Sequence, residues 1–455
     1  MSGRVRALAV LACSLFFTVP ARAIIVYNGK IVPAWPDLPS PAALSKRSAG
    51  AAAAPIHYYQ HPAGTVWGLT LLVDFSDTPP AFTKDEVDAW LNLKGFNRFS
   101  CNGSVRDYYH DASNGKVDFQ NEIHGYYRAK NPKSYYEGVT DYSRAGELVD
   151  EVLAYFDAEV DFSKFDNDKD GKVEAISIVY AGQGQTYAQG LWPHAGSINQ
   201  KRDGVSLTRY MMSDMGTSLS LYVFCHECGH MLFGWPDLYG FGDYCLMANR
   251  PNDQNPPLIN DFFRADQGWL DVVDVDKSMN AFYTIAANGT LGYRFVNPAR
   301  PQELFFWSNY SNVGRRAVLK GRGLFVLHFD KDIGTNNPPD PLCLAVVQAD
   351  GKDELGKTTW PSPGSDTKDY FSKGTGAAFG ASTTPASKWN DGSASGLNIH
   401  DIGAAADTMA FYVGTGSVGL RSVVAGSAIR ILPTARPGTD ARGVVGAKAI
   451  GPRLH

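Results

Sequence analysis

The chain has 455 residues, of which 44% are hydrophobic and 12% aromatic, and its 42 basic side chains nearly balance its 46 acidic ones. A composition this rich in large apolar residues excludes disorder over most of the length, and a formal charge of −4 gives no reason to expect a nucleic-acid partner. The length predicts more than one domain, because single hydrophobic cores stop growing near ~250–300 residues.

The first 23 residues have the pattern of a secretory signal peptide. Arg4 and Arg6 precede an apolar run from Ala7 to Val19, and Ala21–Ala23 supplies the small-x-small cleavage pattern. The apolar run is shorter than the ~20 residues that a membrane span needs, and no other stretch is long enough. A lipoprotein-like pattern ending at Cys13 leaves lipidation as the alternative. We therefore expect a secreted, extracellular protein without a transmembrane segment.

Residues 24–64 carry many proline and alanine residues, which favours a prosegment or linker over a folded core. Residues 65–278 mix apolar runs of strand length with amphipathic helical spacing, the pattern of an α+β catalytic domain. The predicted elements are a strand at 66–73, a helix at 104–110, a strand at 117–127, a helix capped by Ser143, and strands at 176–180 and 206–212.

Residues 279–415 have a different texture, with short apolar runs separated by turn residues. The runs lie at 282–285, 293–296, 304–307, 324–329, 342–347 and 409–413. This spacing is typical of a β-sandwich-like domain. Residues 416–455 contain six basic residues, one acidic residue and no aromatic residue, which predicts a flexible basic tail. Weak contact of this tail with an anionic cell surface is the less favoured use.

The densest set of metal-binding residues lies near the middle of the chain. His226 and His230 are four residues apart, so on a helix both imidazoles project from one face and can share one zinc ion. Glu227 is ~100° further round the helix than His226, close enough to act on water at the metal without ligating it. The apolar run before these residues suits a helix, with Thr217 or Ser218 as its N-cap.

The residues after the second histidine predict a turn that completes the site. Gly234 and Pro236 end the helix, and Asp237 follows where a third zinc ligand is needed, with Asp243 as the alternative ligand. Residues 243–247 predict a tight turn that places Met247 beneath the metal. Such a methionine is the signature of the metzincin zinc peptidases.

Export permits disulfide bonds, but five cysteines beyond the signal peptide are too few for a disulfide framework. Cys225 and Cys228 lie on the helix face opposite the two histidines, so we expect buried thiols rather than zinc ligands. A bridge from one of them to Cys245 is the alternative.

A second metal site is indicated by an acidic run. Asp166, Asp168 and Asp170 with Gly171 form a D-x-D-x-D-G pattern, the oxygen-rich beginning of a calcium loop, and Glu174 is an additional candidate ligand. No pair of flanking helices is evident, so an EF-hand is not expected. A solvated turn is the alternative to calcium. A further acidic group, for which a solvated loop is favoured, comprises Asp330, Asp332, Asp350 and Asp353.

These motifs resemble the immune inhibitor A-type family of secreted bacterial zinc metallopeptidases. Besides the histidine motif, the resemblance rests within residues 65–415 on the segments 103–109, 113–116, 161–171, 192–194, 268–270 and 323–330. It implies a zinc endopeptidase with His226, His230 and Asp237 as ligands and Glu227 as the catalytic residue. The family's usual spacing places a glycine three residues and an aspartate six residues after the second histidine. Here Gly234 is four and Asp237 seven residues after His230.

The resemblance implies an α+β fold, a metzincin-like zinc peptidase domain followed by the β-sandwich-like domain. The expected function is hydrolysis of peptide bonds in extracellular proteins by a zinc-activated water, with Glu227 as general base. Tyr239, Tyr244 and His194 are candidate oxyanion donors, among which the sequence does not choose.

The alternative function is that of a secreted zinc-stabilised binding or adhesion protein without proteolytic activity. Structural zinc sites usually have four protein ligands and no use for a glutamate beside the first histidine, so Glu227 argues against it. A zinc hydrolase acting on other substrates is disfavoured by the family resemblance.

Overall fold

The computed structural model of the protein describes the two strands at 25–27 and 30–32 and the ranges 62–185, 187–333, 342–357 and 363–415. The predicted signal peptide, most of the predicted prosegment and the predicted basic tail lie outside the described residues. Within the described ranges, no helix combines the length and the apolar character needed to cross a membrane.

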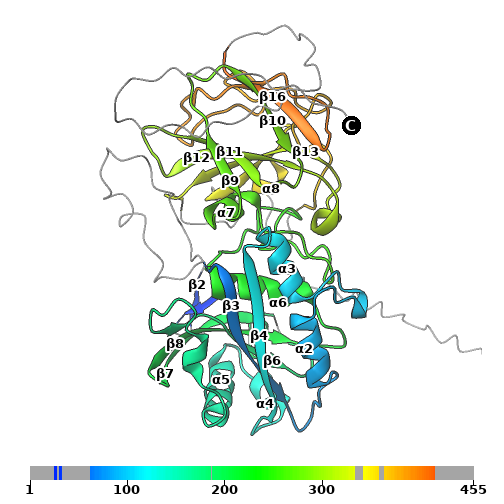
Figure 1. Ribbon diagram of the computed structural model, residues 1–455, viewed down its shortest axis with the longest axis vertical. Helices are drawn as coiled ribbons and strands as arrows, with labels where there is room; N and C mark the ends of the chain where they lie inside the picture. The colour runs from blue at the N-terminus through cyan, green and yellow to red at the C-terminus, as the bar shows by residue number, and fades with distance from the viewer. Residues whose placement is uncertain are drawn as a thin grey trace, which may run out of the picture. The chain divides into compact units, whose positions relative to one another are not determined.

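A mixed eight-stranded sheet organises the first half of the described chain (Figure 1). Its order is β2-β1-β7-β8-β6-β3-β4, with β5 paired to β8. The strands are β1 (Ile25–Tyr27), β2 (Lys30–Val32), β3 (Gly64–Asp74), β4 (Val117–Arg128), β5 (Lys172–Val173), β6 (Ile176–Tyr180), β7 (His194–Arg202) and β8 (Val205–Asp214). Strands β8, β6, β3 and β4 are parallel neighbours, whereas β7 runs antiparallel to β8.

Helices cover both faces of this sheet, which explains the continuous apolar run in β3. Leu72 packs in a cluster with α2, α3 and α6, whereas Leu71 and Val73 pack in a second cluster with α4 and α5. A strand buried on both faces needs apolar residues at every position rather than at alternate ones. The helices are α2 (Lys84–Asn92), α3 (Val105–Ala112), α4 (Lys133–Glu137), α5 (Ser143–Phe156) and α6 (Leu221–Cys228).

The predicted helix at 104–110 and the predicted strand at 117–127 are confirmed as α3 and β4. The predicted cap of α5 is wrong by one residue, because Tyr142 is the N-cap and Ser143 is the first helical residue. The Ser143 hydroxyl donates instead to Asp141 at 2.6 Å. Strand β1 was not expected: it lies in the predicted prosegment and pairs in parallel with β7, with Ile25 opposite Ala195.

Two further sheets form the second half of the described chain. The five-stranded sheet has the order β14-β13-β12-β11-β9, and the three-stranded sheet has the order β10-β16-β15. Their strands are β9 (Asp271–Asp274), β10 (Ala281–Ala286), β11 (Leu291–Val296), β12 (Glu303–Tyr310), β13 (Gly323–Asp330), β14 (Leu344–Val347), β15 (Ile399–His400) and β16 (Thr408–Val413). The two sheets share one hydrophobic cluster, in which Trp307 of β12 packs against Phe411 of β16. The β-sandwich-like and metzincin-like classes stay predictions.

The core around α6 extends into the five-stranded sheet. Phe325 and Leu327 of β13 belong to the same hydrophobic cluster as Cys225 and Cys228 of α6. A buried ion-pair group lies at the same junction: Asp261 accepts hydrogen bonds from Arg264 at 2.7 Å and from Arg316 at 2.5 Å. The predicted regions 65–278 and 279–415 therefore share a core, and β9, from the first of them, belongs to the second region's sheet.

The remaining described helices are short. They are α7 (Asp261–Asp266), α8 (Glu354–Lys357) and the 3₁₀ turns η1 (Arg98–Ser100), η2 (Phe162–Phe165) and η4 (Gly314–Arg316). Arg264 belongs to α7 and Arg316 to η4, so these short elements carry the ion pairs at the junction of the two regions.

Candidate metal centre

The helix that carries the histidine motif begins later than expected. Its N-cap is Ser220, whose hydroxyl accepts a hydrogen bond from the Val223 amide at 3.2 Å, so the predicted caps Thr217 and Ser218 are wrong. The reason is that Leu219 is buried in the core before the helix begins, and its carbonyl accepts from the side chain of Gln254 instead of an amide of the helix.

Helix α6 continues into a π-helical turn, η3 (Gly229–Phe233), that ends at Gly234. Gly234 has φ of +73°, a left-handed conformation that glycine adopts without strain. A π turn contains one more residue per hydrogen-bonded repeat than an α turn, and such turns are frequent at functional sites. His230 lies within this turn, and Asp237 follows three residues after its C-cap, Gly234. The extra residue of the π turn coincides with the one residue by which the spacing from His230 to Asp237 exceeds that of the resembled family.

The structure brings the three predicted zinc ligands together. The Nε2 atoms of His226 and His230 are 3.1 Å apart, and Asp237 Oδ1 lies 3.2 Å from the first and 3.4 Å from the second. Zinc with four ligands at about 2.0–2.1 Å holds neighbouring ligand atoms roughly 3.3 Å apart. All three separations are close to this value.

The protonation of both imidazoles is set by backbone carbonyls. His226 Nδ1 donates to the Leu246 carbonyl at 2.8 Å, and His230 Nδ1 donates to the Trp235 carbonyl at 2.6 Å. Because a carbonyl oxygen can only accept, each neutral ring carries its proton on Nδ1 and presents a lone pair at Nε2. Two such lone pairs and a carboxylate oxygen therefore converge, an arrangement that a cation stabilises and that fits the zinc site.

The charge of Asp237 suits this role. Burial by itself raises the pKa of its carboxyl, but positive charge and N–H donors on the neighbouring His230 and His226 outweigh burial and lower the pKa to about 2. A cation held between the same groups would lower it in the same way. Asp237 is therefore ionised at neutral pH. Burial lowers the pKa of His226, which keeps that imidazole neutral and available as a ligand.

Glu227 lies at the site without joining the ligands. It is 2% exposed, and its Oε2 has no hydrogen-bond partner among the residues that the structure describes. Burial raises its pKa well above the usual range, and the charges of Asp237 and Asp214 add to this effect. A buried, unpartnered carboxylate oxygen of raised proton affinity is suited to accept a proton.

Met247 packs directly against the histidine helix, and its predicted place beneath the metal stays a prediction. A Cβ atom on Gly229 would lie 2.9 Å from the Met247 sulfur, so only glycine fits at this position without displacing the methionine. The backbone of the same turn is bonded to the ligand segment: the Leu238 amide donates to the Met247 carbonyl at 2.7 Å. The turn thereby connects the first histidine, through Leu246, with the residue that follows Asp237.

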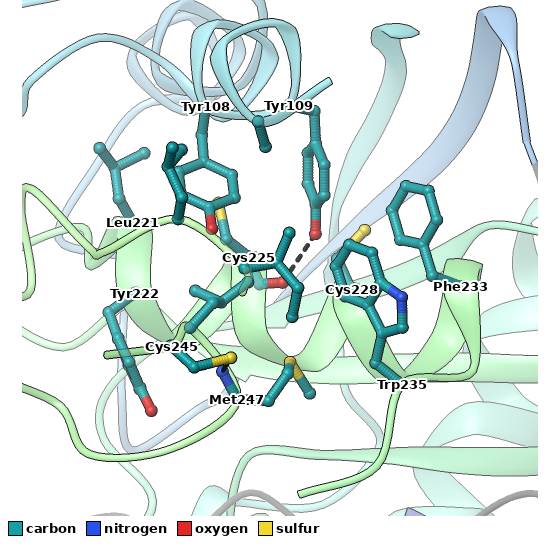
Figure 2. Packing of buried hydrophobic residues seen from close by; sticks show 14 of the residues in the cluster. Tyr108, Tyr109, Leu221, Tyr222, Cys225, Cys228, Phe233, Trp235, Cys245 and Met247 are labelled. Atoms are coloured by element: carbon teal, nitrogen blue, oxygen red, sulfur yellow. Dashed lines mark hydrogen bonds between the residues drawn. The ribbon is translucent and has the colours of Figure 1, made fainter. Parts of the chain in front are cut away.

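The opposite side of α6 faces α3, as Figure 2 shows. Tyr109 donates its hydroxyl to the Cys225 carbonyl at 2.7 Å, and Cys225 and Cys228 are buried beside it. Both thiols thus lie away from the zinc ligands, as predicted. Cys245 is also a free thiol, so the alternative of a disulfide bridge is not found.

The three candidate oxyanion donors differ in their hydrogen-bond partners. His194 is buried with both ring nitrogens engaged: Nδ1 donates to the Trp192 carbonyl at 2.6 Å, and Nε2 accepts from Tyr210 at 2.7 Å. Tyr244 donates to Asp369, in the β-rich region. Tyr239 alone lies beside a ligand, since burial, the charge of Asp237 and a hydrogen bond to it all raise its pKa.

Asp243, the alternative third ligand, is bonded elsewhere in the structure. One of its carboxylate oxygens accepts from the Ser365 amide at 2.9 Å, and the other accepts from the Asn249 side chain at 3.2 Å. The group of metal-ligand atoms that converges at this centre contains Asp237 instead. Asp243 connects the Met247 turn to the β-rich region.

Sequence reasoning missed several residues around the site. Tyr222 donates to the Ala248 carbonyl at 2.8 Å, and its oxygen lies 3.1 Å from His226 Nδ1. Its position four residues before His226, on the same helix face, was a usable signal. Asp214 and Tyr142 both interact electrostatically with Glu227. Asp214 is the last residue of β8 and Tyr142 is the N-cap of α5, and neither belongs to a sequence motif that would have indicated a role.

The predicted calcium residues also converge. Carboxylate oxygens of Asp166, Asp168, Asp170 and Glu174 lie within 4.8 Å of one another. Calcium binds oxygen at about 2.3–2.6 Å, so two ligand atoms on opposite sides of the ion are roughly twice that distance apart. The 4.8 Å separation is within this span. Asp166 is 6% exposed, and its Oδ1 has no hydrogen-bond partner in the described part of the chain. The donor set therefore fits a calcium ion.

The acidic residues near β13 are engaged otherwise. Asp330 accepts from Arg300 at 3.0 Å and from Asn390 at 2.9 Å, and Asp332 accepts from Arg300 and Gln302. One guanidinium, that of Arg300, offsets part of their charge, and side-chain amides donate further hydrogen bonds to them. Asp330 and Asp332 thus have partners without an ion.

Comparison with known proteins identifies no relative of this chain. No protein-family model matches it, and no curated protein matches it. The family resemblance of the motifs therefore stays a prediction.

Proposed function

We propose that the protein is a zinc-dependent endopeptidase that hydrolyses peptide bonds of extracellular proteins. One observation carries the proposal: three proton-free ligand atoms of His226, His230 and Asp237 converge. Glu227, the residue after the first of them, has a buried carboxylate oxygen without a partner in the described part of the chain, and the charge of Asp237 raises its pKa. Secretion follows from the signal-peptide pattern and is part of the proposal.

The three ligands would hold the ion and leave a position open to water and substrate. When bound, zinc supplies a Lewis acid that polarises the substrate carbonyl and lowers the pKa of water. Glu227 accepts the proton that the attacking water loses and then gives it to the leaving amine. Its burial supports both steps, because a raised pKa brings its proton affinity closer to neutral pH.

The ligands are held by the protein rather than by the ion alone. The carbonyls of Leu246 and Trp235 fix both imidazoles in the tautomer that a metal requires. The Met247 turn supports this positioning, because it packs on Gly229 between the two histidines.

The binding or adhesion alternative is less well supported. A structural zinc site uses four protein ligands, whereas the group described here offers three. Burying the Glu227 carboxyl with an unpartnered oxygen lowers the stability of the fold. A role in folding therefore does not explain this glutamate.

A chelator experiment tests the proposal. Purified secreted protein is expected to hydrolyse casein, and 1,10-phenanthroline, which removes zinc but leaves calcium bound, should abolish the hydrolysis. Zinc added after dialysis should restore it. The measurement is release of soluble peptide with and without chelator, with the non-chelating 1,7-isomer as control. Bound zinc without any hydrolysis would favour the binding protein, and hydrolysis insensitive to the chelator would exclude the zinc mechanism.

We also propose that the loop from Asp166 to Glu174 binds calcium, with a stabilising role. A ligand at 100 times its dissociation constant stabilises the folded state by about 2.7 kcal/mol, so calcium should raise the thermal midpoint by several degrees. In D168N this increase should disappear. In D391N, which alters an exposed aspartate that accepts from the Ser393 amide, it should persist. An equal calcium effect in both variants would refute the loop as the site.

A further inference from the structure

Tyr142, the residue that precedes α5, has an unsatisfied hydroxyl in the interior of the protein. The residue is 8% exposed, and its hydroxyl has no hydrogen-bond partner among the described side chains and backbone groups. A buried hydroxyl without a partner costs on the order of 1–3 kcal/mol. Such a group calls for an explanation other than folding, because most buried polar atoms in native proteins are bonded.

The position of Tyr142 connects it to the proposed active site. Its ring lies 4.4 Å from the ring of His194, the first residue of β7. Strand β7 packs against both α6 and η3, the elements that carry the histidine motif. After burial, the strongest influence on the Tyr142 hydroxyl is the charge of Glu227, which raises the pKa of Tyr142.

Tyr142 and Glu227 interact electrostatically, and each has a buried polar atom without a hydrogen-bond partner in the described residues. The Tyr142 hydroxyl has a proton to donate, and Glu227 Oε2 has a lone pair to offer, yet no hydrogen bond joins them in the structure. A peptide group and the water that attacks it satisfy both, since the peptide carbonyl accepts a hydrogen bond and the water donates one.

Four other tyrosines of this region are already engaged. Tyr222 donates to the Ala248 carbonyl, Tyr210 to His194 and Tyr109 to the Cys225 carbonyl. Tyr239 is bonded to Asp237. Tyr142 therefore has the hydroxyl that can bind a substrate without first breaking a bond within the protein.

We propose that Tyr142 is a catalytic residue whose hydroxyl donates a hydrogen bond to the carbonyl oxygen of the peptide bond being cleaved. The inference rests on the proposed peptidase function and adds a residue to it. A donor directed at an oxygen that gains negative charge in the transition state typically contributes 10²- to 10³-fold to kcat. Its contribution to KM is smaller, because the ground-state carbonyl carries less charge.

The test is Y142F in the full-length protein, which removes one oxygen and keeps the ring against His194. With an internally quenched peptide, kcat should fall about 100-fold while KM changes little. Zinc content should remain one per chain. The thermal midpoint should stay the same or rise, because an unsatisfied hydroxyl has been removed.

The matched control is Y135F, seven residues earlier, whose hydroxyl donates to the exposed Glu147. Its kcat should equal that of the unaltered protein. An unchanged kcat in Y142F would overturn the inference and leave the peptidase proposal standing. A lowered midpoint or lost zinc in Y142F would assign the hydroxyl a structural role and also overturn it. If the unaltered protein cleaves nothing, the peptidase proposal fails first and this inference fails with it.

Discussion

Replacing Glu227 by glutamine should abolish peptide hydrolysis while zinc stays bound. Glutamine has the size of glutamate but cannot accept the proton of the attacking water, and general-base catalysis contributes typically 10²- to 10⁴-fold. The ligands should be unaffected, since Glu227 Oε2 bonds to none of the described residues. The measurement is kcat on a quenched peptide together with zinc content by atomic emission.

The same substitution carries a stability signature with a definite sign. Because burial raises the pKa of Glu227, the folded protein disfavours the ionised carboxylate; the resulting loss of stability begins as pH rises above the unfolded-state pKa and is complete above the folded-state pKa. Metal-free E227Q should therefore unfold at a higher temperature than the metal-free unaltered protein at pH 8. E147Q, an exposed substitution, serves as control and should change neither activity nor midpoint. Retained hydrolysis in E227Q would remove Glu227 from the mechanism.

Replacing Asp237 by alanine should lower zinc affinity by at least 100-fold. The substitution removes the single anionic ligand and leaves two neutral imidazoles, and even loss of an outer-shell partner typically costs 10- to 100-fold. Affinity is measured by competition with a chromogenic chelator at pH 7.5, where Asp237 is ionised because its pKa is about 2. Hydrolysis should fall in parallel.

D243A is the matched control for D237A. Asp243 accepts from Ser365 and Asn249 rather than facing the histidines, so its loss should lower the thermal midpoint and leave zinc affinity within a few-fold. The opposite pattern, zinc lost in D243A and kept in D237A, would show that the ligand assignment is wrong.

That His226, His230 and Asp237 lie together could be predicted because their relations are local. Four-residue spacing on a helix determines that His226 and His230 share a face, and a glycine-proline turn returns the chain within a few residues to Asp237. What the spacing did not reveal is the π turn of η3. The rings of Phe233, its last residue, and Trp235 stack with centroids 4.3 Å apart.

The fold was predictable where a pattern lies within one element. The apolar run at 66–73 indicated a strand buried on both faces, and β3 is such a strand. The pairing of β1 with β7 was not predictable, because it joins residues about 170 positions apart and nothing local specifies the register. Tyr142 was missed for the same reason: its neighbours His194 and Glu227 are brought to it by sheet topology.

The shared core of α6 and β13 restricts how this chain can vary during evolution. A chain that ended near residue 278 would expose the apolar surface that packs on Phe325 and Leu327, and Asp261 would lose Arg316. Recombination that exchanges the β-rich half for an unrelated module would therefore leave this apolar surface uncovered, which favours aggregation. The two halves have to be inherited together, and variants of new specificity should arise through point changes and loop insertions instead.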